Sequence, residues 1–383
     1  MPDLRVNYCG VTYRNPLILA SATPGWCGEG MKKAALMGIG GVVPKTLGPV
    51  GDWVDHPRNG RMRVYRVNQT PVGMMDLELF TTKSKEEWID RDMALAKEGG
   101  AVMHISILAM PDPNATARFA REIEATGMAD LLEINVSCPM PADSVGMHIG
   151  KNPELVYQQV KAVKNVTNIP VTIKLTPMVT DIVEIAQAAK DAGADGISIG
   201  NSLRGFAGVD IDTGKPYQRA FCGYGGPAVK PVIMAMIAEV ASKIDIPISA
   251  IGGVSSYKDV VEYIMCGATT VQLATAVLWN GYGIISKIVK DLENWMNSKG
   301  YYSFEEIRGI VLPHITTTEQ LAKESFLTAK IDSDTCVNCG RCQKVCMYEA
   351  ISMNGKVCEV DKDKCDGCGL CTQFCPKEAI NLQ

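Results

Sequence analysis

The sequence has no apolar run long enough to cross a lipid bilayer, which takes about 18 to 20 consecutive residues. Its first residues, Met1 to Arg5, lack the basic and then apolar pattern of a secretory signal peptide. These two absences argue against a membrane-spanning protein and against a secreted one. We therefore expect a cytoplasmic protein.

Positive charge is not in excess either. The chain of 383 residues has 38 Lys and Arg against 42 Asp and Glu, which gives a formal net charge of −4. Proteins that hold nucleic acids contact the phosphates with clustered Lys and Arg. The acidic balance therefore argues against a nucleic acid as the main partner.

Histidines and nucleotide-binding glycine motifs are scarce. No G-x-G-x-x-G follows an expected strand, because the glycines of 25–30 have the wrong spacing. The chain should therefore not bind a nicotinamide dinucleotide by itself. Of the histidines, only His148 is of interest, because it lies ten positions after Cys138. The four histidines show no metal-ligand spacing: His56, His104, His148 and His314.

Cysteines, in contrast, are plentiful and unevenly distributed. Nine of the 14 fall from Cys336 onward, and the other five are scattered over the first 330 residues. Disulfide frameworks are typical of short secreted chains, which this chain is not. The clustering therefore indicates metal ligands.

The cysteine-rich tail repeats the pattern C-x2-C-x2-C-x3-C, at 336–346 and at 365–375. In bacterial ferredoxins three cysteines of such a run bind one [4Fe-4S] cluster, and the fourth binds the other cluster. Gly340 and Gly369 keep the backbone close enough to donate N–H groups to the cluster sulfides. The pattern assigns Cys336, Cys339, Cys342 and Cys375 to one cluster, and Cys365, Cys368, Cys371 and Cys346 to the other.

Structural zinc is the alternative for these cysteines. A zinc site would use two C-x-x-C pairs and leave the third and fourth cysteines of each run without a role. Met347 stands where the first run would usually have proline, which leaves every ligand in place. Cys358 fits neither run, and we expect it to be a small buried side chain.

Before the tail, short β-branched segments alternate with amphipathic helical segments, as in a parallel sheet covered by helices. Apolar residues recur at steps of three and four positions in 154–161 and in 181–186. Eight such units in about 280 residues predict a (β/α)8 TIM barrel, with an open doubly wound sheet as the alternative. The expected strands are 17–22, 41–46, 102–108, 131–137, 170–176, 196–201, 247–252 and 269–274.

Two connections, 47–82 and 203–227, are too long for plain loops. Both follow strands, so in a barrel they would lie at the carboxyl ends of the strands, where active sites form. The barrel pattern stops after Ile310. We expect an α/β barrel domain over 1–310, a linker over 311–330 and a two-cluster ferredoxin-like α+β domain over 331–383.

A segment at the end of the fourth expected strand, Glu133-Ile-Asn-Val-Ser-Cys-Pro139, resembles a known family. It is similar to the N-x-S-C-P segment of the dihydroorotate and dihydropyrimidine dehydrogenases, which are FMN-dependent barrels. Together with two ferredoxin runs, it most resembles the pyrimidine-reducing part of the dihydropyrimidine dehydrogenases, over almost the entire chain. The resemblance implies an iron-sulfur oxidoreductase that contains FMN and two [4Fe-4S] clusters.

The resemblance also implies a set of flavin contacts. Lys45 and Lys174 match residues near the flavin, where a fixed cation suits the negative charge of the reduced form. Gly252 and Gly253 match the phosphate-binding backbone, in the region where TIM barrels generally hold a phosphate. The matched positions are Ala20, Ser21, Lys45, Thr46, Asn135, Lys174, Gly226, Gly252, Gly253, Thr275 and Ala276.

For the reaction, the resemblance implies that hydride passes between flavin N5 and C6 of a pyrimidine-like ring while Cys138 gives a proton to C5. A thiol with a pKa of about 8.5 is mostly protonated at neutral pH, so it can act as the acid. Asn135, Asn201 and Ser202 match positions that hydrogen-bond the edges of the ring. An asparagine suits this role because it supplies both a donor and an acceptor.

Two departures from the family fall at the expected substrate site. Asp76 stands where dihydropyrimidine dehydrogenases have a third asparagine, and an ionised carboxylate can only accept hydrogen bonds. Arg204 adds a cation where the family often has a small residue. Both are candidate substrate contacts, unless they pair with each other or with solvent. The substrate therefore stays open between pyrimidines, other N-heterocycles and hydroxylated aromatic rings.

Other functions remain as alternatives. A dihydroorotate dehydrogenase would favour asparagine at Asp76 and Met140, and it would not ordinarily need a fused ferredoxin. A flavin enzyme acting on tRNA uridines does not suit the acidic charge. A non-catalytic electron-transfer subunit would not need Cys138 with Asn135 and Asn201.

Iron-sulfur clusters pass electrons singly, so the tail indicates an external electron partner. That partner would be a separate flavoprotein subunit that binds NAD(P)H and FAD, or a free ferredoxin. We expect a homodimer or a hetero-oligomer.

Overall fold

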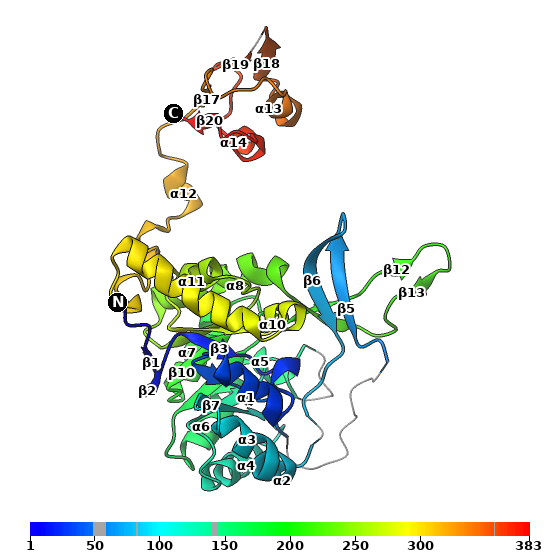
Figure 1. The fold of residues 1–383 in the computed structure, drawn as a ribbon, viewed down its shortest axis with the longest axis vertical. Coiled ribbons are helices and arrows are strands. Elements are labelled where there is room, and N and C mark those ends of the chain that lie inside the picture. The colour runs from blue at the N-terminus through cyan, green and yellow to red at the C-terminus, as the bar shows by residue number, and fades with distance from the viewer. Residues whose placement is uncertain (49–58, 82, 140–144, 356) are drawn as a thin grey trace. The chain divides into compact units, whose positions relative to one another are not determined.

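The computed structural model of the chain describes residues 1–48, 59–81, 83–139, 145–355 and 357–383. They form two compact units, Met1–His314 and Ile315–Gln383 (Figure 1). In the described part of the chain, no helix is both long and apolar enough to span a membrane.

Eight parallel strands close into a barrel in the first unit, which confirms the predicted TIM barrel and excludes the open sheet. Nearly all strand residues are buried, because helices cover the outside and side chains fill the inside. In order around the barrel the strands are β3 (Leu17–Leu19), β4 (Gly41–Val42), β7 (Val102–Leu108), β8 (Leu131–Asn135), β9 (Val171–Leu175), β10 (Gly196–Ile199), β15 (Ile248–Ile251) and β16 (Thr270–Leu273).

Several strands end earlier than the sequence predicts. The first ends at Leu19 and the second at Val42, so residues 20–22 and 43–46 leave the sheet at the mouth of the barrel. Ala20 and residues 43–46 stay buried although they do not continue the ladder, whereas Ser21 and Ala22 are half-buried. Residues 20–22, Lys45 and Thr46 line the site described below.

Amphipathic helices cover the barrel, and side chains cap them. The Asp181 carboxylate, for example, accepts hydrogen bonds from the backbone N–H groups of Val183 (2.8 Å) and Glu184 (3.1 Å). The helices of this unit are α1 (Gly28–Leu36), α2 (Lys85–Glu87), α3 (Ala94–Lys97), α4 (Pro113–Ala125), α5 (Met147–Gly150), α6 (Pro153–Lys164), α7 (Ile182–Asp191), α8 (Lys230–Lys243), α9 (Tyr257–Met265), α10 (Thr275–Asn280) and α11 (Gly283–Lys299).

The two long connections meet in one antiparallel sheet of strand order β11-β14-β6-β5. Strands β5 (Met62–Val67) and β6 (Thr70–Asp76) come from the first connection, and β11 (Leu203–Gly205) and β14 (Cys222–Gly225) come from the second. The register sets Asp76 opposite Gly223. Segments far apart in the sequence therefore lie side by side, as Figure 1 shows for the β5–β6 hairpin and the second connection. A small ladder of β12 (Val209–Asp210) and β13 (Lys215–Pro216) extends the second connection.

An N-terminal hairpin of β1 (Val6–Tyr8) and β2 (Val11–Tyr13) packs against the barrel core. The side chains of Tyr8 and Tyr13 are fully buried. The Tyr8 hydroxyl donates to the backbone oxygen of Ile197, at 3.1 Å, near the start of β10. The hairpin therefore covers the end of the barrel at which the strands begin, opposite their carboxyl ends.

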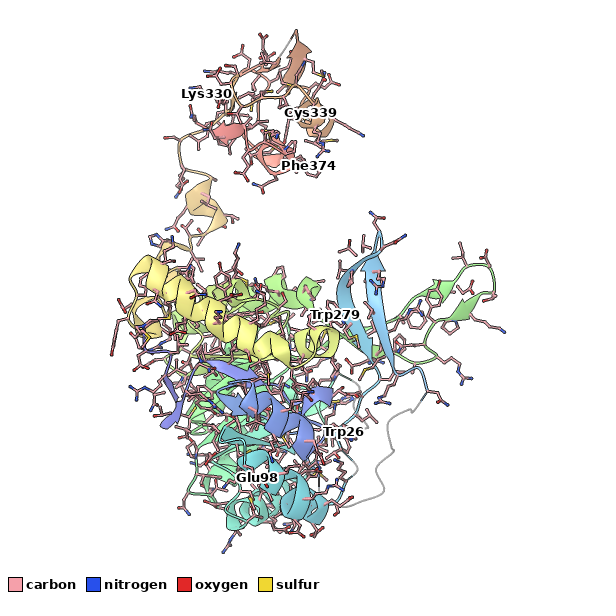
Figure 2. All side chains as sticks on the ribbon, in the orientation of Figure 1. Trp26, Glu98, Trp279, Lys330, Cys339 and Phe374 are labelled. Carbon is pink, nitrogen blue, oxygen red and sulfur yellow. The ribbon has the colours of Figure 1, made fainter. Side chains whose placement is uncertain are left out.

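The second unit is a small α+β fold with two similar halves. Strand β17 (Ala329–Ile331) pairs with β20 (Ile380–Leu382), and β18 (Ile351–Asn354) pairs with β19 (Val357–Val360). Helices α13 (Arg341–Val345) and α14 (Leu370–Phe374) follow the cysteine loops, and a short helix α12 (Thr318–Leu321) precedes them. Pairing with β20 orders β17, so the folded part begins at Ala329, inside the stretch that the sequence assigns to a linker. Figure 2 labels Cys339 and Phe374 in this unit.

Candidate active site and cluster ligands

A cavity of about 810 Å³ opens at the carboxyl ends of the barrel strands. A second cavity, of about 540 Å³, shares part of its lining with the first, including Ser21, Lys174, Asn201 and Gly225. The two cavities together form one site that runs from the sheet of the two insertions to the ends of β15 and β16.

Lys174, near the end of β9, is buried in the floor of this site and lines both cavities. Its ammonium group has no hydrogen-bond or ion-pair partner within the described ranges. Burial lowers the pKa of Lys174, Glu133 opposes that shift, and Lys45 adds to it. A buried cation that faces a cavity indicates an anionic or electron-rich ligand.

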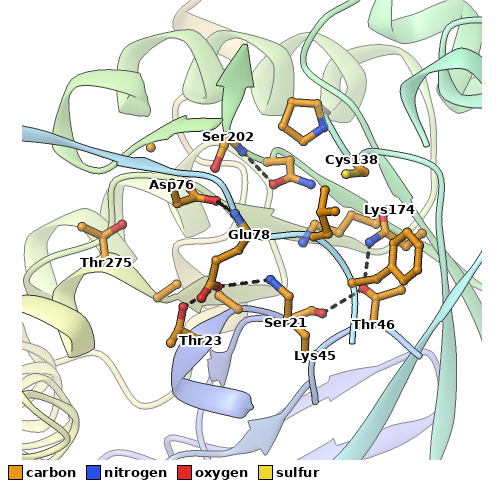
Figure 3. A pocket seen from close by; sticks show the side chains of 18 of the residues that line it. Ser21, Thr23, Lys45, Thr46, Asp76, Glu78, Cys138, Lys174, Ser202 and Thr275 are labelled. Atoms are coloured by element: carbon orange, nitrogen blue, oxygen red, sulfur yellow. Dashed lines mark hydrogen bonds and ion pairs between the residues drawn. The ribbon is translucent and has the colours of Figure 1, made fainter. Parts of the chain in front are cut away.

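Lys45 and Glu78 form an ion pair in the wall of the site, with 3.3 Å between Nζ and Oε2 (Figure 3). Glu78 also accepts hydrogen bonds from Thr23 and from Arg61. Burial alone would raise the pKa of Glu78, but Lys45, Thr23 and Arg61 together hold it below its usual value. Glu78 is not among the site residues predicted from the sequence. The sequence signal for it is weak, because Glu78 is simply a second acidic residue two positions after Asp76.

A network of hydrogen bonds links residues that lie in or just after four strands, β3, β4, β7 and β8. Thr46 Oγ1 lies 3.0 Å from the hydroxyls of both Ser21 and Ser106, and it accepts a hydrogen bond from Asn135 Nδ2 at 2.8 Å. Asn135 Oδ1 accepts from the Ser137 hydroxyl at 2.8 Å. These hydrogen bonds engage both the Nδ2 and the Oδ1 atoms of Asn135, so the orientation of its amide group is fixed.

The hydrogen-bond network continues to the second long connection, 203–227. Asn201 Nδ2 donates to Ser137 Oγ at 2.7 Å, and Asn201 Oδ1 accepts from the backbone N–H of Ser202 at 2.7 Å. Asn135, Asn201 and Ser202, which the sequence identifies as ring contacts, therefore come together in one wall of the cavity.

Asp76 ends β6 and lines the same cavity. Burial raises the pKa of Asp76 to about 6, although Lys45 and a hydrogen bond from Ser202 oppose this shift. Figure 3 shows Asp76 and Ser202 beside each other. Asp76 is therefore an acid that titrates near neutral pH within the site.

Cys138 lies on the loop after β8, and Figure 3 shows it near Lys174. Both residues line the cavity, as does Asn135. Its backbone oxygen accepts a hydrogen bond from the N–H of Met147 at 3.1 Å. Gly146 packs so closely that an added Cβ would lie 2.9 Å from the Cβ of Cys138. The returning chain therefore holds Cys138 in place.

The second cavity is bordered by Ala20, Gly226, Gly252, Gly253 and Thr275, all of which the sequence assigns to FMN. A Cβ at Gly225 would meet Ser202 Oγ at 3.5 Å and Thr275 Oγ1 at 3.9 Å, which are ordinary contacts. Glycine there keeps the cavity open instead of relieving a clash. The lining fits a flat cofactor with an anionic tail, which FMN is.

Three residues of interest lie elsewhere. Arg204 is exposed, and its guanidinium lies over the ring of Phe221, 4.7 Å from the centroid. Among the described residues it forms no ion pair with Asp76, and it does not line the cavity. Ala276 is buried behind the lining. His148 is exposed on α5. Met140 and His56 lie outside the described residues.

In the second unit, the cysteines surround two small pockets. One pocket is lined by Cys336, Cys339, Cys342 and Cys375, and the other by Cys346, Cys365, Cys368 and Cys371. Each group takes three cysteines from one run and one from the other run. This grouping is the one that the spacing of the runs predicts.

The number and origin of the thiols bear on which metal group fits. Four thiols of the two runs line each pocket. Three cysteines of one run and the fourth of the other are the ligand set of a [4Fe-4S] cluster in bacterial ferredoxins.

The comparisons with known proteins agree with both units. The family model for dihydroorotate dehydrogenase matches residues 3–296, and the model for a 4Fe-4S dicluster domain matches residues 329–382. The crystal structure of ligand-free DHODH from Eimeria tenella superposes with a TM-score of 0.66, over 82% of this chain and 93% of that chain, at 18% identity. At that identity, the superposition supports the fold alone.

Two kinds of relative are similarly close. The chain is 36% identical to the catalytic subunit of dihydroorotate dehydrogenase B (NAD(+)) from Pyrococcus abyssi, over 81% of this chain and 99% of the relative. It is 31% identical to the NAD-dependent dihydropyrimidine dehydrogenase subunit PreA from Escherichia coli K12, over 90% of this chain and 85% of the relative. The chain therefore belongs to the dihydroorotate dehydrogenase family of oxidoreductases and carries a 4Fe-4S dicluster domain after its barrel.

Proposed function

We propose that the chain is an FMN-dependent oxidoreductase that reduces a C=C bond of a pyrimidine-like ring, with electrons delivered through two [4Fe-4S] clusters. The observation that carries the proposal is the convergence of Cys138, Lys174, Asn135 and Asn201 on one cavity. A merely structural barrel has no need for a thiol in the same pocket as a buried cation that has no ion-pair partner among the described residues. This convergence argues against a non-catalytic electron-transfer subunit.

When bound, FMN would supply hydride exchange with one carbon of the ring. Lys174 would hold the negative charge of the reduced flavin, and the cavity bordered by Gly252 and Gly253 would hold the phosphate end. Lys45 is engaged by Glu78, so its charge is already balanced. Of the two lysines, Lys174 is thus the one available to compensate a cofactor charge.

Cys138 would complete the reduction of the ring. As hydride arrives at one carbon of the double bond, the Cys138 S–H bond breaks and its proton goes to the neighbouring carbon, while the thiolate takes its next proton from solvent. Asn135 and Asn201 would orient the ring, because their amide groups are fixed by the hydroxyls of Thr46 and Ser137. Fixed amides position a ring without a further entropic cost.

Asp76 would select among rings. Above a pH of about 6 its carboxylate is ionised and accepts hydrogen bonds only. The edge of the ring that faces Asp76 should therefore carry donors, such as ring N–H or amino groups. Arg204 drops out of this set because it does not line the cavity.

Dihydroorotate dehydrogenase activity is the second candidate, favoured by the identity to the Pyrococcus abyssi subunit. The tail distinguishes the candidates. That relative matches over 99% of its own length but over only 81% of this chain, whereas the Escherichia coli PreA subunit matches over 90% of this chain. A fused pair of clusters therefore supports dihydropyrimidine dehydrogenase chemistry.

The clusters also imply an electron donor outside this chain. The relatives are named as a catalytic subunit and as a subunit of NAD-dependent enzymes. We propose that the electron donor is a flavoprotein subunit that binds NAD(P)H and FAD, or a free ferredoxin. We also propose that the protein is cytoplasmic and forms a homodimer or a hetero-oligomer.

Anaerobic reoxidation of the photoreduced holoenzyme tests the proposal. Uracil, thymine, orotate and a panel of amino-substituted pyrimidines and hydroxyaromatic rings would be mixed with it while the flavin absorbance is followed. A pyrimidine should restore the oxidised band, and Cys138→Ala should slow that step by about 10²- to 10⁴-fold with flavin and iron retained. Cys266→Ala, a buried cysteine outside the cavity, is the matched control. Reoxidation by orotate alone would favour the second candidate, and normal turnover of Cys138→Ala would remove the proton-donor role.

A further inference from the structure

The charged side chains of the first cavity bear on which ring it binds. Among the described residues these are Lys45, Asp76, Glu78 and Lys174. Lys45 and Glu78 form an ion pair with each other, and Lys174 is the cation that compensates the reduced flavin in the proposed function. Asp76 forms no ion pair within the described ranges. Its carboxylate is therefore the charge that the cavity presents to a bound ring.

The surroundings of Asp76 hold its carboxylate in the cavity wall. Oδ1 accepts a hydrogen bond from the backbone N–H of Glu78 at 3.3 Å. Gly223 faces Asp76 across the ladder of β6 and β14, and a Cβ added to this glycine would lie 3.1 Å from Asp76 Oδ2 and 2.9 Å from Ser202 Cβ. Glycine at 223 therefore leaves room for both side chains. Each carboxylate oxygen has two lone pairs, so both oxygens can still accept from a ligand.

A carboxylate in a fixed place selects the pattern of donors on the edge of a ligand. Because it accepts at both oxygens, it matches an edge with two adjacent donors, such as a ring N–H beside an amino group. Uracil has no such edge, since each of its N–H groups is flanked by carbonyl groups or by a C–H group. A ring carbonyl opposite Asp76 would leave two acceptors facing each other without a donor, which weakens binding.

The charge of Asp76 favours the same kind of ring. Burial raises the pKa of Asp76 to about 6, so the carboxylate is mostly ionised at neutral pH. A donor-rich edge stabilises this partly buried negative charge. An anionic ring such as orotate would instead bring a second negative charge into the site, and like charges disfavour binding.

We propose that the substrate is an aminopyrimidine whose ring N–H and neighbouring amino group both donate hydrogen bonds to Asp76. Isocytosine, which is 2-amino-4-oxopyrimidine, has these adjacent donors in its N3–H form and keeps a C5=C6 bond. That bond would take up one hydride and the proton of Cys138, as in the proposed function, on which this inference rests. Asp76 and Cys138 come from different elements, and Figure 3 shows them apart from each other, as contacts to two parts of one ring require.

Binding and reduction of three rings by the anaerobic holoenzyme test the inference. Cytosine is the matched isomer of isocytosine, because its amino group lies beside a ring nitrogen that accepts. Isocytosine should bind the oxidised holoenzyme about 10²-fold more tightly than cytosine or uracil, measured by calorimetry, and it should reoxidise the photoreduced flavin faster than either.

Two variants connect this preference to Asp76. Asp76→Asn should invert the preference toward uracil, because an amide presents a donor beside an acceptor, as the N–H and C=O groups of uracil do. A merely structural role would weaken the binding of all three rings alike. Arg204→Ala is the control and should keep the preference for isocytosine, since Arg204 does not line the cavity.

The outcomes separate this inference from the proposed function. Uracil or orotate preferred over isocytosine by the unaltered chain would overturn the inference, and so would an unchanged preference in Asp76→Asn. Reduction of uracil would still support the proposed function. If Asp76→Asn does not retain flavin, the order of the three rings with the unaltered chain decides. A flavin that no pyrimidine reoxidises would overturn the proposed function itself, and the inference with it.

Discussion

Lys45 Nζ lies 3.3 Å from Glu78 Oε2, in a pair whose side chains are only 9% and 4% exposed. The pair joins the end of β4 to the segment after β6, so it ties the first insertion to the barrel. Breaking a buried pair on one side leaves an uncompensated charge, which costs about 3 to 5 kcal/mol. The stability of the carboxyl end of the barrel therefore depends on both Lys45 and Glu78.

Glu78→Gln should lower the free energy of unfolding of the cofactor-free chain by about 3 kcal/mol, measured by urea denaturation. Lys32 and Glu98 form an exposed pair in the same unit, so Glu98→Gln is the control, with an expected change below about 1 kcal/mol. Equal losses from the two substitutions would contradict this account of the site.

The raised pKa of Asp76 predicts a specific pH dependence. The folded chain keeps Asp76 protonated up to about pH 6, whereas the unfolded chain loses that proton near 3.8. Stability should therefore fall as pH rises from about 4 to about 6, and then level off. Asp76→Asn should remove that decline, worth about 1 to 2 kcal/mol after allowance for partial exposure, as judged by thermal unfolding across this range. Parallel profiles for both chains would place the titration elsewhere.

Gly146→Ala should slow ring reduction without loss of flavin. Its φ is +57°, and an added Cβ would lie 2.9 Å from the Cβ and 3.0 Å from the backbone oxygen of Cys138. Displacing the proton donor should lower turnover about 10²-fold. Gly127→Ala is a matched control, since its φ is +66° with no atom within 4 Å of an added Cβ. It should cost similar stability with normal turnover, and equal turnover in the two variants would count against Cys138.

Lys174→Met should affect the cofactor-free and cofactor-loaded chains in opposite ways. Without FMN, the substitution removes a buried charge that has no ion-pair partner in the described part of the chain, so the melting temperature should rise. With FMN, it removes the cation that compensates the reduced flavin, so the flavin should bind less tightly when reduced and its potential should fall. Calorimetry and a flavin titration check the two effects. A lower melting temperature in the cofactor-free chain would show that Lys174 is already compensated.

Most of the fold follows from the sequence because its signals are local. Each of the eight buried strands and each cysteine run can be recognised from a few consecutive residues. The structure contains the eight barrel strands and two pockets lined by the cysteines of the runs. The strand ends are less predictable. Residues such as Ala20 and Lys45 are as buried as strand residues, so burial alone does not show where the ladder stops.

The site was predictable where chemistry follows a strand directly, as at Asn135, Cys138 and Lys174. It was not predictable where two insertions meet, because no local pattern reports that β6 pairs with β14. For the same reason Glu78 could not be identified from the sequence, since its partner Lys45 lies before the first insertion. Arg204 shows the converse case, since proximity to Ser202 in the chain does not bring its side chain into the cavity.

The ladder between β6 and β14 makes the two insertions a single structural unit. Asp76 on β6 faces Gly223 on β14. A change of length or register in either insertion would therefore displace Asp76, which is proposed to determine the substrate preference. Transplanting substrate preference between relatives should therefore require both segments to be moved together as one cassette, with the eight-stranded scaffold left untouched.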